Sequence, residues 1–201
     1  MKGLLPGISE WSWFSEEKQI DFNGHFLHVG EHRILVDPPL MTSSEIAQIR
    51  QSGQLDYILL TNRDHVRETA TYQKEFQCRL YVPEIDAPEM SVTPDEVYRD
   101  QELLPGGIWA IQLSDQKSKG ETALFIQQGK GVLIVGDAIL GKPAGSVCML
   151  PAEKYADVDK AREGLRRLLK YNFDALLVGD GASILTGAKP IVEQALGFAQ
   201  E

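Results

Sequence analysis

The sequence predicts an α/β fold of four layers, in which two β-sheets pack face to face and helices cover their outer faces. Two hairpins carry much of this prediction, because residues 19–36 and 122–135 each contain β-like runs separated by turn residues. Hairpins form antiparallel pairs, which do not suit a doubly wound parallel sheet. Each half of the chain also places strand-like runs before helical patterns, as expected if each half forms one sheet with its own helices.

The first half begins as an antiparallel meander over residues 10–37. Asn23-Gly24 and Gly30-Glu31-His32 separate its β-like runs and are typical of turns. Thr42 is suited to cap a helix, and Gly53 is suited to end it. The rest of this half is expected to be a strand at 56–60, a helix at 66–76 and a strand at 79–82.

The second half repeats this order of elements. A strand is expected at 108–113, followed by the hairpin at 122–135. Apolar residues recur every three or four positions over 155–170 and predict one helix there. A final strand at 173–178 precedes a C-terminal helix, in which Pro190 occupies a tolerated first-turn position.

Composition narrows the classes of function. The 201 residues suit a single domain, 1–201, with a substantial core. A net charge of −9 argues against a nucleic-acid partner, which requires a basic surface. No apolar run reaches the roughly 18–20 residues of a membrane span, and the N-terminus lacks the apolar stretch of a signal peptide. We therefore expect a cytoplasmic protein with a small-molecule partner and no membrane partner, which is compatible with a homo-oligomer.

Three strand-like runs end in acidic residues. The run before residue 61 is followed by Asp64-His65, and two later runs end in Gly136-Asp137 and Gly179-Asp180. If these strands lie side by side, their acidic residues converge at one sheet edge. The set suits one divalent ion and is poor for two. Each acid also has a structural explanation, because Asp is common as a helix cap and as a turn residue.

Five landmarks occur in a fixed order along the chain. They are Asp37-Pro38-Pro39 after a strand, the segment 59–66, the segment 116–124, Gly136-Asp137 and Gly179-Asp180-Gly181. Their order resembles that of the metallo-β-lactamase-fold hydrolases over nearly the whole chain. In that family the second landmark is Thr-His-x-His-x-Asp-His, the third is Gly-His-Thr-x-Gly and the last is Gly-His-Gly. The resemblance implies the four-layer fold, a hydrolase activity and a largely structural role for Asp37.

The residues at the metal-ligand positions differ from the family pattern. If Thr61 and Asp64-His65 are both aligned with the second landmark, two residues are missing and both preceding His ligands are absent. An ungapped alignment instead puts Asn62 and Asp64 at two His positions and Val66 at the Asp. The gapped alignment is preferred because it keeps a real Asp-His pair, but both remain open. The third landmark then has Lys117 for its His.

The resemblance implies a ligand set for a single ion. The family has two metal sites. Of the ligands of the first site, only Asp137 is present here, and Lys117 would bring an ammonium group to it. The other site would use Asp64, His65, Asp137 and Asp180, where Asp180 replaces the family's last His. Three carboxylates and one imidazole favour harder ions such as Mn or Fe(II) over Zn. The expected cofactor is one divalent metal (Mn, Fe or Zn), or none.

Two hypotheses of function follow. In the first, the chain is a hydrolase of an ester, thioester or phosphoester, in which Asp64 and His65 are catalytic. Substrate or anion contacts would come from Lys117, Arg67, Asn62 and Glu121. In the second, the chain is a non-catalytic descendant that binds a small molecule or a partner. An ion-pair cluster would then replace the metals, formed by Asp64, Asp137 and Asp180 with Lys117, Arg63 and Arg67.

Overall fold

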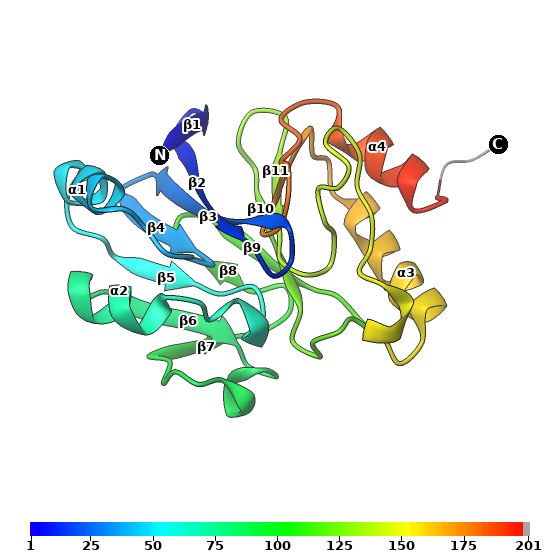
Figure 1. Ribbon diagram of the computed structural model, residues 1–201, viewed down its shortest axis with the longest axis horizontal. Coiled ribbons are helices and arrows are strands. Elements are labelled where there is room, and N and C mark those ends of the chain that lie inside the picture. The colour runs from blue at the N-terminus through cyan, green and yellow to red at the C-terminus, as the bar shows by residue number, and fades with distance from the viewer. Residues whose placement is uncertain (199–201) are drawn as a thin grey trace.

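Two β-sheets face each other at the centre of the molecule, and two helices lie on the outer face of each (Figure 1). The structure is a computed structural model and describes residues 1–198. The larger sheet has the strand order β1-β2-β3-β4-β5-β6-β7, and the smaller has the order β12-β11-β10-β9-β8. The predicted four-layer αββα arrangement is therefore confirmed.

The larger sheet contains β1 (Lys2–Leu5), β2 (Ile8–Ser15), β3 (Ile20–Val29), β4 (His32–Val36), β5 (Tyr57–Leu59), β6 (Arg79–Pro83) and β7 (Glu96–Tyr98). The smaller sheet contains β8 (Leu103–Leu104), β9 (Ile108–Gln112), β10 (Thr122–Ile126), β11 (Val132–Val135) and β12 (Ala175–Val178). The helices are α1 (Ser43–Ser52), α2 (Thr69–Phe76), α3 (Val158–Leu165) and α4 (Ala188–Ala195). Four 3-10 turns join them: η1 (Arg63–His65), η2 (Ala87–Glu89), η3 (Ala152–Lys154) and η4 (Arg166–Lys170). Among these described residues, no helix is both long enough and apolar enough to cross a bilayer.

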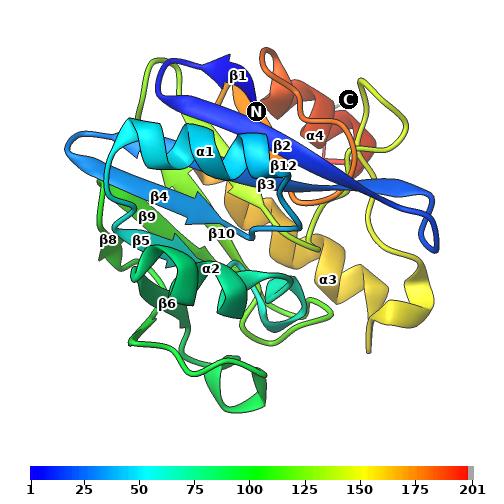
Figure 2. The same cartoon turned by 60° about the vertical axis from the view of Figure 1, so that its left-hand side comes forward.

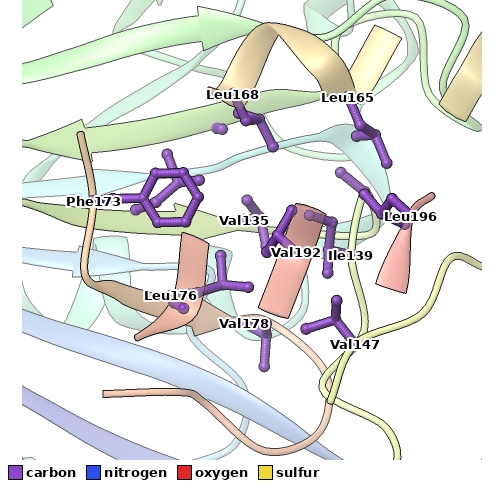
Figure 3. Packing of buried hydrophobic residues seen from close by; sticks show 14 of the residues in the cluster. Val135, Ile139, Val147, Leu165, Leu168, Phe173, Leu176, Val178, Val192 and Leu196 are labelled. Carbon is purple, nitrogen blue, oxygen red and sulfur yellow. The ribbon is translucent and has the colours of Figure 1, made fainter. Parts of the chain in front are cut away.

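The core has three apolar layers because strand side chains alternate between the two faces of a sheet. In β4, Ile34 and Val36 point between the sheets, whereas Leu35 points outward against α1 and α2. In β10, Leu124 lies between the sheets and Phe125 lies in the outer layer under α3 and α4. Figure 2 shows α1 and α2 lying over the larger sheet. Figure 3 shows the outer layer of the smaller sheet, where α3 and α4 pack their apolar side chains against β11 and β12.

Strand direction brings the ends of four strands together. β4 and β5 pair in parallel, with Val36 opposite Leu59. β11 and β12 also pair in parallel, with Val135 opposite Val178. A bridge between Phe22 and Asp180 then joins β3 of the larger sheet to the loop after β12. The loops that follow these four strands therefore meet at one seam between the two sheets.

The structure corrects several element predictions. Asn23-Gly24 was expected to form a turn, but β3 continues through it as one long strand. Gly24 is required there because an ideal Cβ would lie 2.4 Å from the ring of Trp11. The single helix expected over 155–170 is α3 followed by the 3-10 turn η4. The short edge strands β1, β7 and β8 were not predicted.

Candidate functional site

The candidate site begins with a buried carboxylate at the end of β4. Asp37 accepts hydrogen bonds from the amide of Thr61 at 2.8 Å and from its hydroxyl at 2.6 Å. Its Oδ2 also lies 2.8 Å from His65 Nδ1. Burial opposes the charge of Asp37, but the charges of His65 and Arg67 outweigh it and lower the pKa of Asp37. Asp37 therefore fixes both the loop after β5 and the orientation of the His65 ring.

His65 lies between two carboxylates. Its Nδ1 faces Asp37, and its Nε2 lies 3.5 Å from Asp137 Oδ1. Burial and the guanidinium of Arg67 oppose a charged imidazole, but Asp37 and Asp137 outweigh them and raise the pKa of His65 to about 10. A pKa raised in this way favours the imidazolium form of His65 at neutral pH, in which both ring nitrogens carry a proton.

Lys117 places its ammonium group between the carboxylates of Asp64 and Asp137. Its Nζ lies 2.6 Å from Asp137 Oδ2 and 3.0 Å from Asp64 Oδ2. Burial opposes the lysine charge, but these two carboxylates raise the pKa of Lys117. Asp137 responds in the opposite direction: burial opposes its charge, but His65 and Lys117 hold its pKa well below the usual range.

Arg67 ties the loops of the two sheets together. Its guanidinium donates to the carbonyl oxygens of Asn23 at 2.7 Å, Asp37 at 3.0 Å and Gly179 at 3.1 Å. It also donates to Asp180 Oδ1 at 2.8 Å. The backbone of Arg67 has φ +42°, a left-handed conformation that non-glycine residues rarely adopt. Such backbone strain is characteristic of functional sites, where the surrounding structure holds it in place.

Three side chains could hold a metal ion. Ligand atoms of His65, Asp137 and Asp180 all lie within 4.8 Å of one another, and all three residues are buried. Three protein donors are the number found in catalytic zinc sites, which keep a further position open. The set therefore fits one ion in number and proximity. Binding would require His65 to lose its Nε2 proton, and Arg67 Nη2, only 3.4 Å from that nitrogen, would have to move away.

The predicted ligand Asp64 lies outside this group of donors. Its carboxylate pairs with Lys117 and is 37% exposed, whereas the Asp180 carboxylate is 11% exposed. Burial raises the pKa of Asp180, although the charges of His65 and Arg67 act in the opposite direction. Of the four predicted ligands, His65, Asp137 and Asp180 thus come together, while Asp64 contributes through Lys117.

The predicted substrate-contact residues separate into two kinds. Lys117 and Arg67 line a cavity above the acids. Asn62 is fully buried, and its side chain accepts hydrogen bonds from the amides of Asp64 and His65, so it shapes the loop. Glu121 is also fully buried, and its Oε2 has no hydrogen-bond partner. Arg63 points to Glu89 at the surface and does not join the predicted ion-pair cluster.

Sequence reasoning missed a carboxylate that holds the loops of the site in place. Asp86 is 1% exposed and accepts hydrogen bonds from the amides of Arg63 and Gly120, each at 2.9 Å, and from the hydroxyl of Ser118. It therefore anchors both the Asp64 loop and the Lys117 loop. Nothing in the local sequence distinguishes Asp86, which follows β6 and belongs to none of the five landmarks.

The site opens into a cavity of about 450 Å³. Its floor carries Asp64, His65, Asp137 and Asp180 with their cations, and its walls are partly apolar. Pockets that bind small molecules commonly combine apolar walls with a few converging polar groups. The geometry therefore suits a small molecule whose polar group reaches the acids and cations at the floor.

Comparisons with known proteins agree with the fold. The sequence profile of the metallo-beta-lactamase superfamily matches residues 1–196. The DIM-1 metallo-beta-lactamase superposes with a TM-score of 0.72 at 14% identity, covering 96% of each chain. A metallo-beta-lactamase from Pontibacter korlensis superposes with a TM-score of 0.73 at 14% identity, covering 95% of this chain and 93% of the other chain. A metallo-beta-lactamase family protein from Thermus thermophilus gives 0.72 at 17% identity, covering 97% of this chain and 80% of its own. Among curated proteins, none has a matching sequence.

Proposed function

Because this chain belongs to the metallo-β-lactamase superfamily, we propose that it is a hydrolase whose centre holds one divalent ion between His65, Asp137 and Asp180. The observation that carries the proposal is the convergence of these three buried donors at the floor of a small-molecule cavity. The substrate class is an ester, a thioester or a phosphoester. The donor set, with two carboxylates and one imidazole, accommodates Mn, Fe(II) or Zn.

The residues of the chain have distinct roles in this proposal. A bound ion would supply a polarised water and an electrophile for the substrate oxygen. Asp37 orients the His65 ring through Nδ1, which is the usual task of a carboxylate behind a metal-binding histidine. Lys117 neutralises Asp137 and offers a positive charge to an oxyanion formed on the substrate. Asp64 keeps the Lys117 ammonium in position.

Ion binding competes with two features of the site. His65 must release a proton, since a metal-binding imidazole is neutral, and Arg67 must leave Asp180. Both requirements weaken the affinity for the ion. We therefore expect looser metal binding than in a site built from neutral histidines, and one proton released for each ion bound at neutral pH.

Metal analysis tests the proposal directly. Protein purified without a metal-binding tag should contain close to one divalent ion per chain, measured by plasma mass spectrometry, or take one up from a metal solution. Asp180→Asn should abolish uptake, because it removes a charged donor. Asp64→Asn is the matched control and should retain the ion, since Asp64 lies outside the three-donor group. Loss of uptake in Asp64→Asn would support the larger ligand set that includes Asp64.

A second candidate function is favoured by the contacts of Lys117 and Arg67. Three cations, Lys117, Arg67 and His65, already pair with nearby carboxylates, so little uncompensated negative charge remains to recruit an ion. These carboxylates are Asp37, Asp64, Asp137 and Asp180. In this candidate the protein binds its small molecule without a metal and performs no metal-assisted hydrolysis. Protein that stays free of metal after incubation with excess Mn, Fe(II) and Zn would contradict the hydrolase proposal and support this one.

A further inference from the structure

The mouth of the cavity differs in charge from the chain as a whole. The chain has a net charge of −9, yet three lysines line the cavity in addition to His65, Arg67 and Lys117 at its floor. Lys18 lies in the turn between β2 and β3, Lys142 follows β11, and Lys154 ends η3. Three separate segments of the chain thus place a long cationic side chain at one opening.

These outer lysines have fewer ion-pair partners within the protein than the cations at the floor. Lys117 and Arg67 are each held by buried carboxylates. Lys18 pairs only with its exposed neighbour Glu17, and within residues 1–198 neither Lys142 nor Lys154 forms an ion pair. Their ammonium groups therefore retain the capacity to pair with an incoming anion.

The wall between mouth and floor is apolar. It is lined by Ile20, Phe22, Leu140, Leu150 and Pro151. Phe22 is fixed from below by the Arg67 guanidinium, which lies 4.9 Å from the centre of its ring. A ligand that fills this space would bury apolar surface against a wall that is already ordered, which favours binding.

From this arrangement we infer that the cavity binds a small organic anion, with an apolar body against the wall and a carboxylate, phosphate or sulfonate group at the lysines. The inference names a substrate class for the hydrolase proposed above and rests on that proposal for its chemistry. The binding step itself does not require the metal, because the lysines and the apolar wall lie outside the three-donor group.

Three probes separate the contributions of charge and apolar surface. Naphthalene-2-sulfonate carries both features and resists hydrolysis, 2-naphthalenemethanol carries only the apolar body, and inorganic sulfate carries only the charge. Binding is measured by titration calorimetry and by probe fluorescence, in chelator and again with added divalent ion. We expect the sulfonate to bind at least several-fold more tightly than either partial probe, and its affinity to fall as salt is raised.

A charge-matched pair of double variants tests the lysines. Lys142→Gln with Lys154→Gln should weaken sulfonate binding about fivefold and leave the alcohol unaffected, as expected for the loss of two exposed ionic contacts. Lys74→Gln with Lys130→Gln removes two positive charges from exposed positions away from the cavity and should leave both affinities unchanged. Equal losses in the two double variants, or equal affinities for the sulfonate and the alcohol, would overturn the inference.

These experiments distinguish failure of the anion-binding inference from failure of the hydrolase proposal. Selective sulfonate binding that persists in chelator, in a protein that never takes up metal, supports the anion pocket and contradicts the hydrolase. Uptake of one metal without any preference among the three probes supports the metal centre and contradicts the anion pocket.

Discussion

Glu121 is a buried acidic side chain near the site that forms no ion pair within the described residues and, unlike Asp86, leaves one carboxylate oxygen without a hydrogen-bond partner. It is fully buried, its Oε1 accepts a hydrogen bond from the amide of Ala138 at 3.2 Å, and its Oε2 has no partner. Burial, together with the negative charge of Asp137, raises the pKa of Glu121 well above the ordinary value. The folded protein therefore keeps Glu121 protonated in a pH range where the unfolded chain has released that proton.

This difference predicts a specific pH dependence for stability. Above the unfolded pKa of 4.5, the folded state binds one more proton than the unfolded state, so stability falls as pH rises towards the folded pKa. The slope from this one group is at most about 1.4 kcal/mol per pH unit. Glu121→Gln removes the titration but keeps the shape, so we expect its stability relative to wild type to increase as the pH rises from the unfolded pKa of 4.5 towards the raised folded pKa.

Urea unfolding of both proteins across this pH range measures the difference. Glu153→Gln is the control, because Glu153 is exposed and lies outside the buried cluster. Parallel stability profiles for Glu121→Gln and wild type would show that Glu121 is ionised in the folded protein, which contradicts its assignment as a neutral carboxylic acid.

At this scale the sequence predicted which acids gather, but not how they are paired. Asp137 and Asp180 end neighbouring parallel strands, so their convergence follows from strand direction alone. The role of Arg67 depends on the distance between loops from opposite sheets, which no local pattern contains. The same limit explains why Asn62 was placed in the substrate site, whereas its side chain closes its own loop.

Among the elements, β3 shows how a tertiary contact can override a turn signal. Asn-Gly is the preferred pair for a tight hairpin turn, yet here it lies inside a ten-residue strand. The Asn23 side chain donates to the carbonyls of Val178 and Gly181, and Gly24 leaves room for the ring of Trp11. Both residues therefore serve the packing of β3 against its neighbours, which the hydrophobic pattern of the strand could not indicate.

Gly24→Ala should therefore destabilise the protein. The new Cβ would lie 2.4 Å from Trp11 Cζ2 and 2.6 Å from Pro39 Cδ, and Trp11 is itself held by a hydrogen bond to the Pro39 carbonyl. Overpacking of a buried site costs about 1–3 kcal/mol. Gly3→Ala, in β1, is the matched control because its Cβ would meet nothing within 4 Å. Chemical denaturation compares the two, and equal stabilities would mean that Trp11 moves aside without cost.

For the whole molecule, the site is also part of the junction between the two sheets. Arg67 comes from the loops of the larger sheet and reaches Gly179 and Asp180 at the end of the smaller one. Asn23 joins the same two regions from β3. The overall layers were predictable, because hairpins and helical periodicities are local. The junction was not, since it joins residues more than a hundred positions apart.

Arg67→Met tests this junction and the identity of the cation within it. The variant keeps most of the aliphatic bulk but leaves the mostly buried Asp180 carboxylate without its cation, a loss that typically costs about 3–5 kcal/mol. Arg63→Met is the control and should change stability by less than about 1 kcal/mol, because Arg63 pairs with an exposed carboxylate. Thermal unfolding measures both variants, and Arg67→Lys extends the series if Arg67→Met does not fold.

Divalent ions then separate the two candidate functions. Without the guanidinium beside His65 and Asp180, one competitor of the metal is gone from the three donors. A ligand that binds only the folded state raises the unfolding midpoint. If the protein is a metal-dependent hydrolase, added Mn or Zn should stabilise Arg67→Met more than wild type. A midpoint that does not respond to any of these ions would mean that the donors cannot assemble around a metal even when their competitor is gone. The cluster would then be a metal-free ion-pair network, with Arg67 and Lys117 as its permanent cations.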